Sequence, residues 1–114
     1  MEPKRLQKVS RLIQKEMGEI LQQESRTHFG GAMITVTRVN ITADLSIARL
    51  NLSIFPLGKE TTESIFKLIV EKRSYLRNIL AQRIRNQIRI IPNLQFFIDD
   101  SLDYIENIER LLKE

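Results

Sequence analysis

The spacing of hydrophobic residues at the start of the chain predicts a long amphipathic helix over residues 4–24. Apolar residues recur there every three or four positions, which places them along one side of a helix. This apolar side consists of Leu6, Val9, Ile13, Met17 and Ile20. Basic residues follow the same spacing on the opposite side, and these are Lys4, Lys8, Arg11 and Lys15. Because cations oppose the dipole at a helix N-terminus, this row favours contact with a polyanion over a purely stabilising role.

Two strands are predicted after this helix. Residues 25–32 interrupt the helical pattern and contain a turn at Gly30-Gly31. Alternation then predicts a strand over residues 33–41, in which a phase slip at Thr37-Arg38 indicates a β-bulge. A second alternating strand covers residues 48–54. We expect the two strands to form an antiparallel hairpin.

The chain from Thr61 onward is predicted to be helical again, with Thr61 or Thr62 as the N-cap. Its apolar side consists of Ile65, Ile69, Leu76, Ile79 and Leu80. Ile84 and Ile88 continue at four-residue spacing, but on a straight helix they would lie about 60–100° away from the earlier stripe. A kink at Ala81 would bring both halves onto the same sheet, so we expect the helix to bend there.

A third strand is predicted over residues 94–98, and a short acidic helix over residues 100–114. The strand follows Pro92 and alternates apolar and polar side chains. A helical crossover joins the second strand to the third, which favours parallel pairing with a right-handed connection. The predicted fold class is therefore α+β, with a three-stranded sheet and helices packed mainly on one face.

Charge is distributed unevenly along the 114 residues, whose net charge is +4. Residues 1–91 hold 16 Lys and Arg against 8 Asp and Glu, whereas residues 92–114 hold 2 against 6. A basic body suits a polyanion partner, and an acidic end would stay away from it. Length and composition favour a single domain with no membrane span, no secretory signal and, without cysteine, no disulfide.

A second set of cations lies in the later half of the chain, at Arg73, Arg77, Arg83, Arg85 and Arg89. Together with the basic row of the first helix, it provides for roughly five to eight phosphate contacts. Aromatic residues make up only 6% of the chain. This scarcity favours recognition through the backbone and shape of RNA over a platform of stacked bases.

Catalytic chemistry has little support. The one histidine, His28, has no neighbouring nucleophile pattern, so a loop or packing role is the better interpretation. Four carboxylates, at Asp99, Asp100, Asp103 and Glu106, could bind a hard cation or serve a small hydrolase, but strand-end and helix-cap roles explain them more simply. We find no zinc spacing and no dinucleotide motif, so no metal, no cofactor and no enzymatic activity are expected.

Several short motifs occur in an order and spacing that resembles the ribosome-binding factor A family over nearly the whole chain. The motifs are Arg5-x-x-x-Val9, Val39-x-Ile41-x-x-Asp44-Leu45, Ala48-Arg49-Leu50, Tyr75-Leu76-Arg77-x-x-Leu80-Ala81, Pro92-x-Leu94-x-Phe96, Asp99-Asp100-Ser101 and Ile108-x-x-Leu111-Leu112.

The resemblance implies a type II KH-like fold in one RNA-binding domain spanning residues 1–114. It also implies a monomeric ribosome biogenesis factor of the cytoplasm, or of the organellar matrix for an organellar homologue lacking its transit peptide. Such a factor binds the small ribosomal subunit and its ribosomal RNA during late maturation, including 5′-end processing. KH domains clamp nucleic acid with a GxxG loop between two helices. Ala81-Gln82-Arg83-Ile84 is expected at that position, without glycine.

A protein-interaction module that docks through a sheet edge or the final helix is the alternative. Salt distinguishes the two hypotheses, because RNA binding weakens steeply as salt rises whereas apolar docking changes little.

Overall fold

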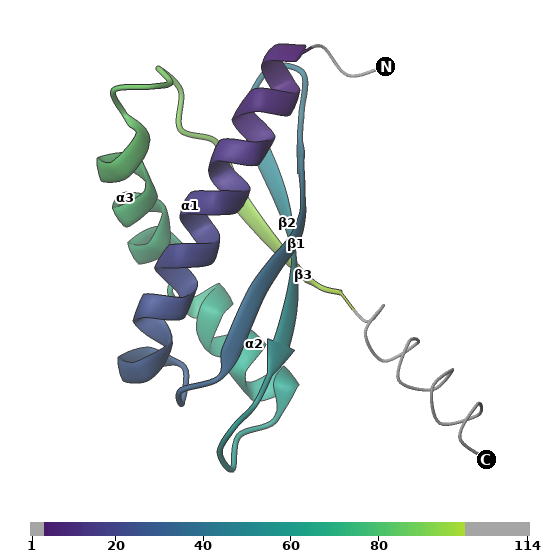
Figure 1. Cartoon of the computed structure of the whole chain (residues 1–114), viewed down its shortest axis with the longest axis vertical. Coiled ribbons are helices and arrows are strands. Elements are labelled where there is room, and N and C mark those ends of the chain that lie inside the picture. Colours follow the sequence, from purple (N-terminus) through teal and green to yellow (C-terminus); the bar gives the residue numbers. More distant parts are fainter. Residues whose placement is uncertain (1–3, 100–114) are drawn as a thin grey trace, which may run out of the picture.

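The computed structural model describes residues 4–99, which form three helices and a three-stranded sheet (Figure 1). The elements are α1 (Lys4–His28), β1 (Met33–Ile41), β2 (Ile47–Phe55), α2 (Thr62–Glu71), α3 (Arg73–Ile84) and β3 (Asn93–Ile98). Their order and the α+β class agree with the prediction. The predicted final helix over residues 100–114 lies outside the described residues.

The strands are arranged in the order β1-β2-β3. β1 pairs antiparallel with β2, and its register shifts between Val36 and Arg38, so the predicted hairpin and bulge are confirmed. β3 pairs parallel with β2, as the helical crossover predicted. The helices pack against one face of the sheet (Figure 1). Side chains that alternate toward this face, such as Leu50, Leu52 and Leu94, are buried.

α1 contributes the largest single share of the core, and its predicted apolar side is confirmed. All five residues of that side are buried. The helix is longer than predicted, since it continues to His28. The extension is stabilised by the buried Ser25, whose hydroxyl donates to the carbonyl of Ala32, and by burial of Phe29 directly after the helix. The predicted turn follows, where Gly30 and Gly31 adopt positive φ angles of 63° and 76°.

The expected kink at Ala81 is wrong. The break between the two helices falls at Lys72, and α3 runs without interruption through Ala81 to Ile84. The shift in apolar spacing that suggested a bend arises because the helix ends at Ile84, so Ile88 is not on a helix at all. Ile88 then reaches the core from a turn, with its backbone N–H donating to the carbonyl of Ile84.

Two glutamines of α1 occupy the outer edge of β1. Gln14 Nε2 donates to the carbonyl of Val36 at 3.0 Å, and Gln22 Oε1 accepts the backbone N–H of Ile34 at 3.1 Å. These side chains satisfy backbone groups that an edge strand otherwise leaves unpaired. α1 is thereby fixed in position along the sheet, which places its basic N-terminal turns beside the loops at one end of the molecule.

Candidate nucleic-acid interface

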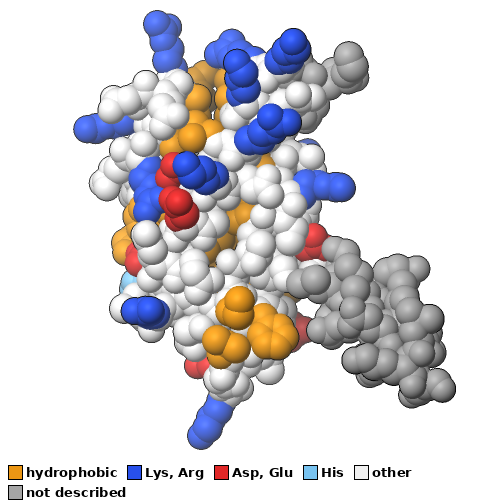
Figure 2. All heavy atoms as spheres, in the orientation of Figure 1, with side chains coloured by type: hydrophobic (Ala, Val, Ile, Leu, Met, Phe, Trp, Pro, Cys, Tyr) orange, Lys and Arg blue, Asp and Glu red, His pale blue; other side chains and the backbone are white. Residues whose placement is uncertain are grey.

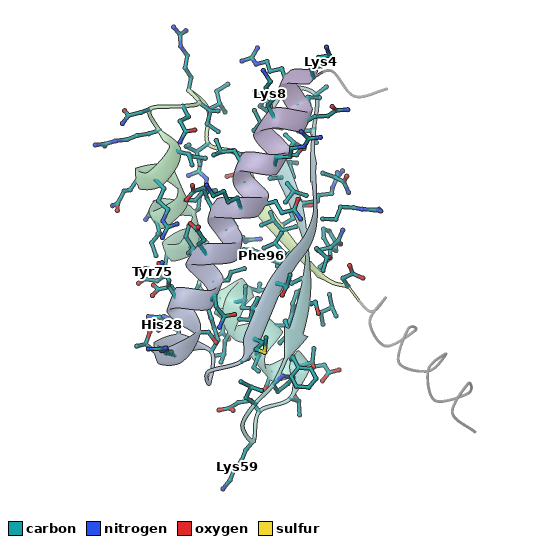
Figure 3. All side chains as sticks on the ribbon, viewed as in Figure 1. Lys4, Lys8, His28, Lys59, Tyr75 and Phe96 are labelled. Carbon is teal, nitrogen blue, oxygen red and sulfur yellow. The ribbon has the colours of Figure 1, made fainter. Side chains whose placement is uncertain are left out.

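A groove of about 840 Å³ opens at the end of the molecule where α1 begins. It lies between the first turns of α1, the turn joining β1 to β2, and the loop before β3. Lys4, Arg5 and Lys8 of α1 line one side, and Arg89 comes from the loop. Figure 3 shows Lys4 and Lys8 at this end, far from Lys59. We call this site the basic groove.

The floor of the basic groove is apolar. Val9 and Leu12 come from α1, Leu45 from the β1–β2 turn, and Ile88 and Ile90 from the loop before β3. Ile90 is 52% exposed, although most large apolar side chains of the fold are buried. Figure 2 shows orange apolar atoms between blue basic groups at this end of the molecule. The site therefore combines a cationic rim with an uncovered apolar floor.

The turn that presents Leu45 is held by a compact set of hydrogen bonds. Leu45 has a φ of 62°, in the left-handed region that a branched side chain rarely adopts. The Asp44 carboxylate accepts hydrogen bonds from the hydroxyls of Thr42 and Ser46, both at 2.7 Å, and from the Ser46 backbone N–H. The hydrogen bonds of Ser46 and Thr42 lower the pKa of Asp44 to about 2. The turn is therefore fixed with Leu45 facing the groove.

The basic row predicted on α1 reaches the groove only in part. All four of its residues are exposed. Lys4 and Lys8 line the groove, whereas Arg11 and Lys15 lie further along the helix and outside it. Arg5 lines the groove as well but was not among the predicted RNA contacts. The sequence singled out Arg5 only as part of the motif Arg5-x-x-x-Val9, and its place in the groove depends on a loop that is distant in sequence.

Two of the predicted arginines instead stabilise the fold. Arg83 Nη1 forms ion pairs at 2.9 Å with both Glu16 and Glu19, and its Nη2 donates to Gln23. The hydrogen bond to Glu16 is the main reason that the pKa of Arg83 is raised. Arg77 donates from Nε to the carbonyl of Pro92 and from Nη2 to that of Ile91. Both side chains direct their donors into the protein.

The three remaining arginines of the second set lie in three different segments of the chain. Arg73 is exposed at the start of α3, directly after the helix break. Arg85 is exposed in the turn that follows α3, and Arg89 lies in the loop beyond it. Of the five arginines, Arg89 alone lines the basic groove. The two sets of cations therefore come together only in the basic groove, where Arg89 and the first turns of α1 line the same site.

His28 takes part in a ring cluster away from the groove. Its imidazole contacts the ring of Tyr75 edge-on, with 5.5 Å between centroids, and Lys72 Nζ lies 5.4 Å from the centre of the same ring. The Tyr75 hydroxyl donates to Glu24, and this hydrogen bond raises the tyrosine pKa. His28 and Tyr75 lie together beside the end of α1 (Figure 3). The cluster joins α1 to α3.

The structure describes one of the four carboxylates considered as cation ligands. Asp99 accepts a hydrogen bond from the Thr37 hydroxyl of β1. Asp100, Asp103 and Glu106 lie outside the described residues. Among residues 4–99, no three His, Cys, Asp or Glu side chains gather closely enough to hold a metal ion. None of the helices in the same range combines the length and the apolar character that crossing a bilayer requires.

Fold and site together define a KH-like domain of type II with a basic groove at one end. The crossover from β2 to β3 contains the helix pair that KH domains join through a GxxG loop. Here the junction consists of Glu71, Lys72 and Arg73, and it has no glycine. The expectation that Ala81-Gln82-Arg83-Ile84 occupies the GxxG position is therefore wrong, because these residues form the last turn of α3.

Comparison with known proteins identifies the family. The sequence model of ribosome-binding factor A matches residues 5–112. Ribosome-binding factor A of Cytophaga hutchinsonii is 44% identical over 114 residues, covering all of this chain and 84% of the relative. That of Flavobacterium johnsoniae is 45% identical over 115 aligned positions, covering 98% of this chain and 85% of the relative. The chain belongs to the ribosome-binding factor A family.

Solved structures agree on the fold. The crystal structure of ribosome-binding factor A from Thermus thermophilus aligns with a TM-score of 0.67 and 18% identity, over 82% of this chain and 94% of that one. A homology model of the Thermus thermophilus factor, fitted into a cryo-EM map of its complex with the 30S subunit, aligns with a TM-score of 0.56 and 19% identity. This second alignment covers 78% of this chain and 93% of the other.

Proposed function

We propose that this protein is a ribosome biogenesis factor that binds the small ribosomal subunit through its ribosomal RNA. The observation that carries the proposal is the basic groove, in which cations from the start of α1 meet Arg89 across an apolar floor. Family membership supports the choice of partner, as does the small-subunit complex named for the Thermus relative.

Binding follows from the chemistry of the rim. Lys4, Arg5, Lys8 and Arg89 contact phosphates, which position the RNA without reading its sequence. The exposed aromatic side chains Phe55, Tyr75 and Phe97 do not line the groove, so the rim is no platform for stacking a series of bases. Arg77 and Arg83 act indirectly by holding α3 and the loop before β3 in place.

The factor acts late in small-subunit maturation, including the step that processes the 5′ end, and it does so without catalysis. Binding alone is sufficient for this role. A protein that binds one conformation of the RNA more tightly than another shifts the RNA toward the first conformation, by the difference between the two binding free energies. The protein works as a single cytoplasmic domain and as a monomer. It requires neither a cofactor nor a metal ion.

Charge reversal tests the site. The double variant Lys8→Glu/Arg89→Glu changes one cation on each side of the groove, and we expect affinity for isolated small subunits to fall roughly tenfold or more. Co-sedimentation at fixed salt measures the change. Lys59→Glu/Lys67→Glu is the matched control, because it alters the charge equally at exposed residues outside the groove. Equal binding by the two double variants would contradict the assignment of the groove.

An apolar patch keeps a second candidate function open, namely docking of a protein partner through the sheet. Met33 of β1 pairs with Phe55 of β2, and these side chains are 55% and 56% exposed, with Leu57 exposed at 61% nearby in sequence. If this patch is the principal contact, Phe55→Ser should weaken subunit binding more than the groove variant does.

A further inference from the structure

The apolar floor of the basic groove is not explained by phosphate binding. Phosphates require cations and N–H donors, and neither the sugar nor the phosphate of RNA covers a large apolar surface. Leu12, Leu45 and Ile88 are only half-buried in the floor, and Ile90 stands mostly in water next to Arg89. An apolar surface that stays uncovered inside a charged rim is typical of a site whose ligand has both a charged and an apolar part.

The conformation of Leu45 strengthens this argument. Its left-handed backbone is unfavourable for a branched side chain, and the Asp44 turn described above maintains it. The Leu45 N–H donates to the Thr42 carbonyl at 2.9 Å, which closes the turn. The result is an apolar side chain fixed in place before any ligand arrives, and pre-organisation of this kind favours binding.

We propose that the basic groove binds an unpaired nucleotide of RNA, with the face of its base on the apolar floor. The phosphates on either side of that nucleotide contact the α1 cations and Arg89, which come from two different elements that border the groove. This inference rests on the proposed function and specifies its ligand. A paired A-form helix cannot occupy the site in this way, because its base faces are stacked inside the helix.

RNA is a better occupant than an acidic peptide for two reasons. The family is named for binding to ribosomes, in which RNA is the polyanion, and the cations of the groove come from two separate elements, as successive phosphates of one strand require. The groove also contains one side-chain amide, that of Gln87. An amide offers both a donor and an acceptor to a base edge, so Gln87 is the residue in position to discriminate among bases.

Binding of two labelled RNA hairpins to the full chain tests the proposal. The two hairpins have the same tight, structured terminal loop, and the stem of one has a single-nucleotide bulge whereas the stem of the other is fully paired and of equal length. We expect fluorescence anisotropy to show tighter binding of the bulged hairpin, by roughly fivefold, because burial of one apolar surface is added to equal phosphate contacts. A 2-aminopurine at the bulge should change its emission on binding.

Ile90→Ser removes exposed floor without changing charge, and Leu57→Ser is its matched control at another exposed apolar residue. Ile90→Ser should reduce the preference for the bulge to near unity, because the affinity for the bulged hairpin falls by more than the affinity for the paired hairpin. Leu57→Ser should retain the preference.

The outcomes separate this inference from the proposed function. Equal affinity of the unmodified protein for both hairpins, with both lost in Lys8→Glu/Arg89→Glu, would overturn the nucleotide site and leave RNA binding intact. A bulge preference that survives Ile90→Ser would overturn it as well. Binding of both RNAs that is insensitive to Lys8→Glu/Arg89→Glu would contradict the assignment of the groove and with it the nucleotide site, whereas failure of the unmodified protein to bind either RNA would contradict the proposed function itself. Displacement of the bulged hairpin by an acidic amphipathic peptide at equal concentration would assign the floor to a protein partner.

Discussion

At the residue scale, the β1–β2 turn shows how local chemistry prepares the groove. Among residues 4–99, Leu45 is the one non-glycine residue with a positive φ angle. Asp44 sustains that conformation by accepting from Thr42 and Ser46 on both sides of it. The carboxylate must be charged to accept all of these hydrogen bonds, and this requirement explains why its pKa falls to about 2.

A pH dependence follows from the Asp44 pKa. The folded value of about 2 lies below the ordinary value of 3.8, so the carboxylate stabilises the fold above about pH 4, and this stabilisation is lost as pH falls toward 2. Asp44→Asn lacks this contribution. We therefore expect the free energy of unfolding to fall more steeply between pH 4 and pH 2 in the unmodified protein than in Asp44→Asn. Urea unfolding at several pH values measures both slopes, and parallel curves would refute the role of Asp44.

At the scale of elements, α1 is the helix around which the others are positioned. Gln14 and Gln22 attach it to the edge of β1. On its other side, Glu16 and Glu19 bind Arg83 of α3. This ion-pair network adds to the core packing that holds α3 beside α1, while the loop that holds Arg89 is attached to α3 by the hydrogen bonds of Arg77.

Arg83 and Arg89 should therefore respond differently to the same substitution. Arg83→Gln breaks two partly exposed ion pairs, so we expect a loss of about 1 kcal/mol in the free energy of unfolding and little change in affinity for RNA. Arg89→Gln should weaken RNA binding and leave stability almost unchanged, because its side chain is exposed at the groove. Thermal unfolding and RNA titration of both variants test the contrast. Stronger loss of RNA binding in Arg83→Gln would reverse the assignment.

At the scale of the whole molecule, the basic groove and a second exposed apolar patch lie at opposite ends of the β1–β2 hairpin. The basic groove lies beside the turn between β1 and β2, and the exposed patch of Met33, Phe55 and Leu57 lies at the opposite end of these strands. Figure 2 shows this patch as an orange group near the lower end of the molecule. A polyanion approaching the protein is therefore attracted to one end.

Salt dependence should report the number of phosphates bound. With one phosphate at each of the four groove cations, affinity for single-stranded RNA should fall about 50-fold between 50 and 200 mM salt. Equilibrium titration at four or more salt concentrations gives the slope. Lys8→Glu should make the slope shallower. A slope near zero would instead favour apolar docking and contradict electrostatic binding at the groove.

Much of the fold was predictable because it depends on local patterns. The apolar side of α1, the bulge at Thr37-Arg38 and the Thr61 cap follow from spacing and side-chain chemistry within a few residues. The helix break was not predictable in the same way. Lys72 is neither glycine nor proline. The apolar stripe misses one turn at Lys72 and Arg73 but resumes in phase at Leu76, seven residues after Ile69, so the pattern still indicated one continuous helix.

The sequence alone determined the α+β class, the strand pairing and the excess of basic residues, since periodicity and composition are properties of the chain itself. Only the tertiary structure decided which cations are available to a ligand. Arg83 and Arg89 are the same residue type, and the sequence pattern did not distinguish them. Arg83 forms ion pairs with Glu16 and Glu19 on α1, whereas Arg89 lines the groove with Lys4 and Arg5. The physical reason is that the availability of a charge depends on partners distant in sequence, which only packing brings together.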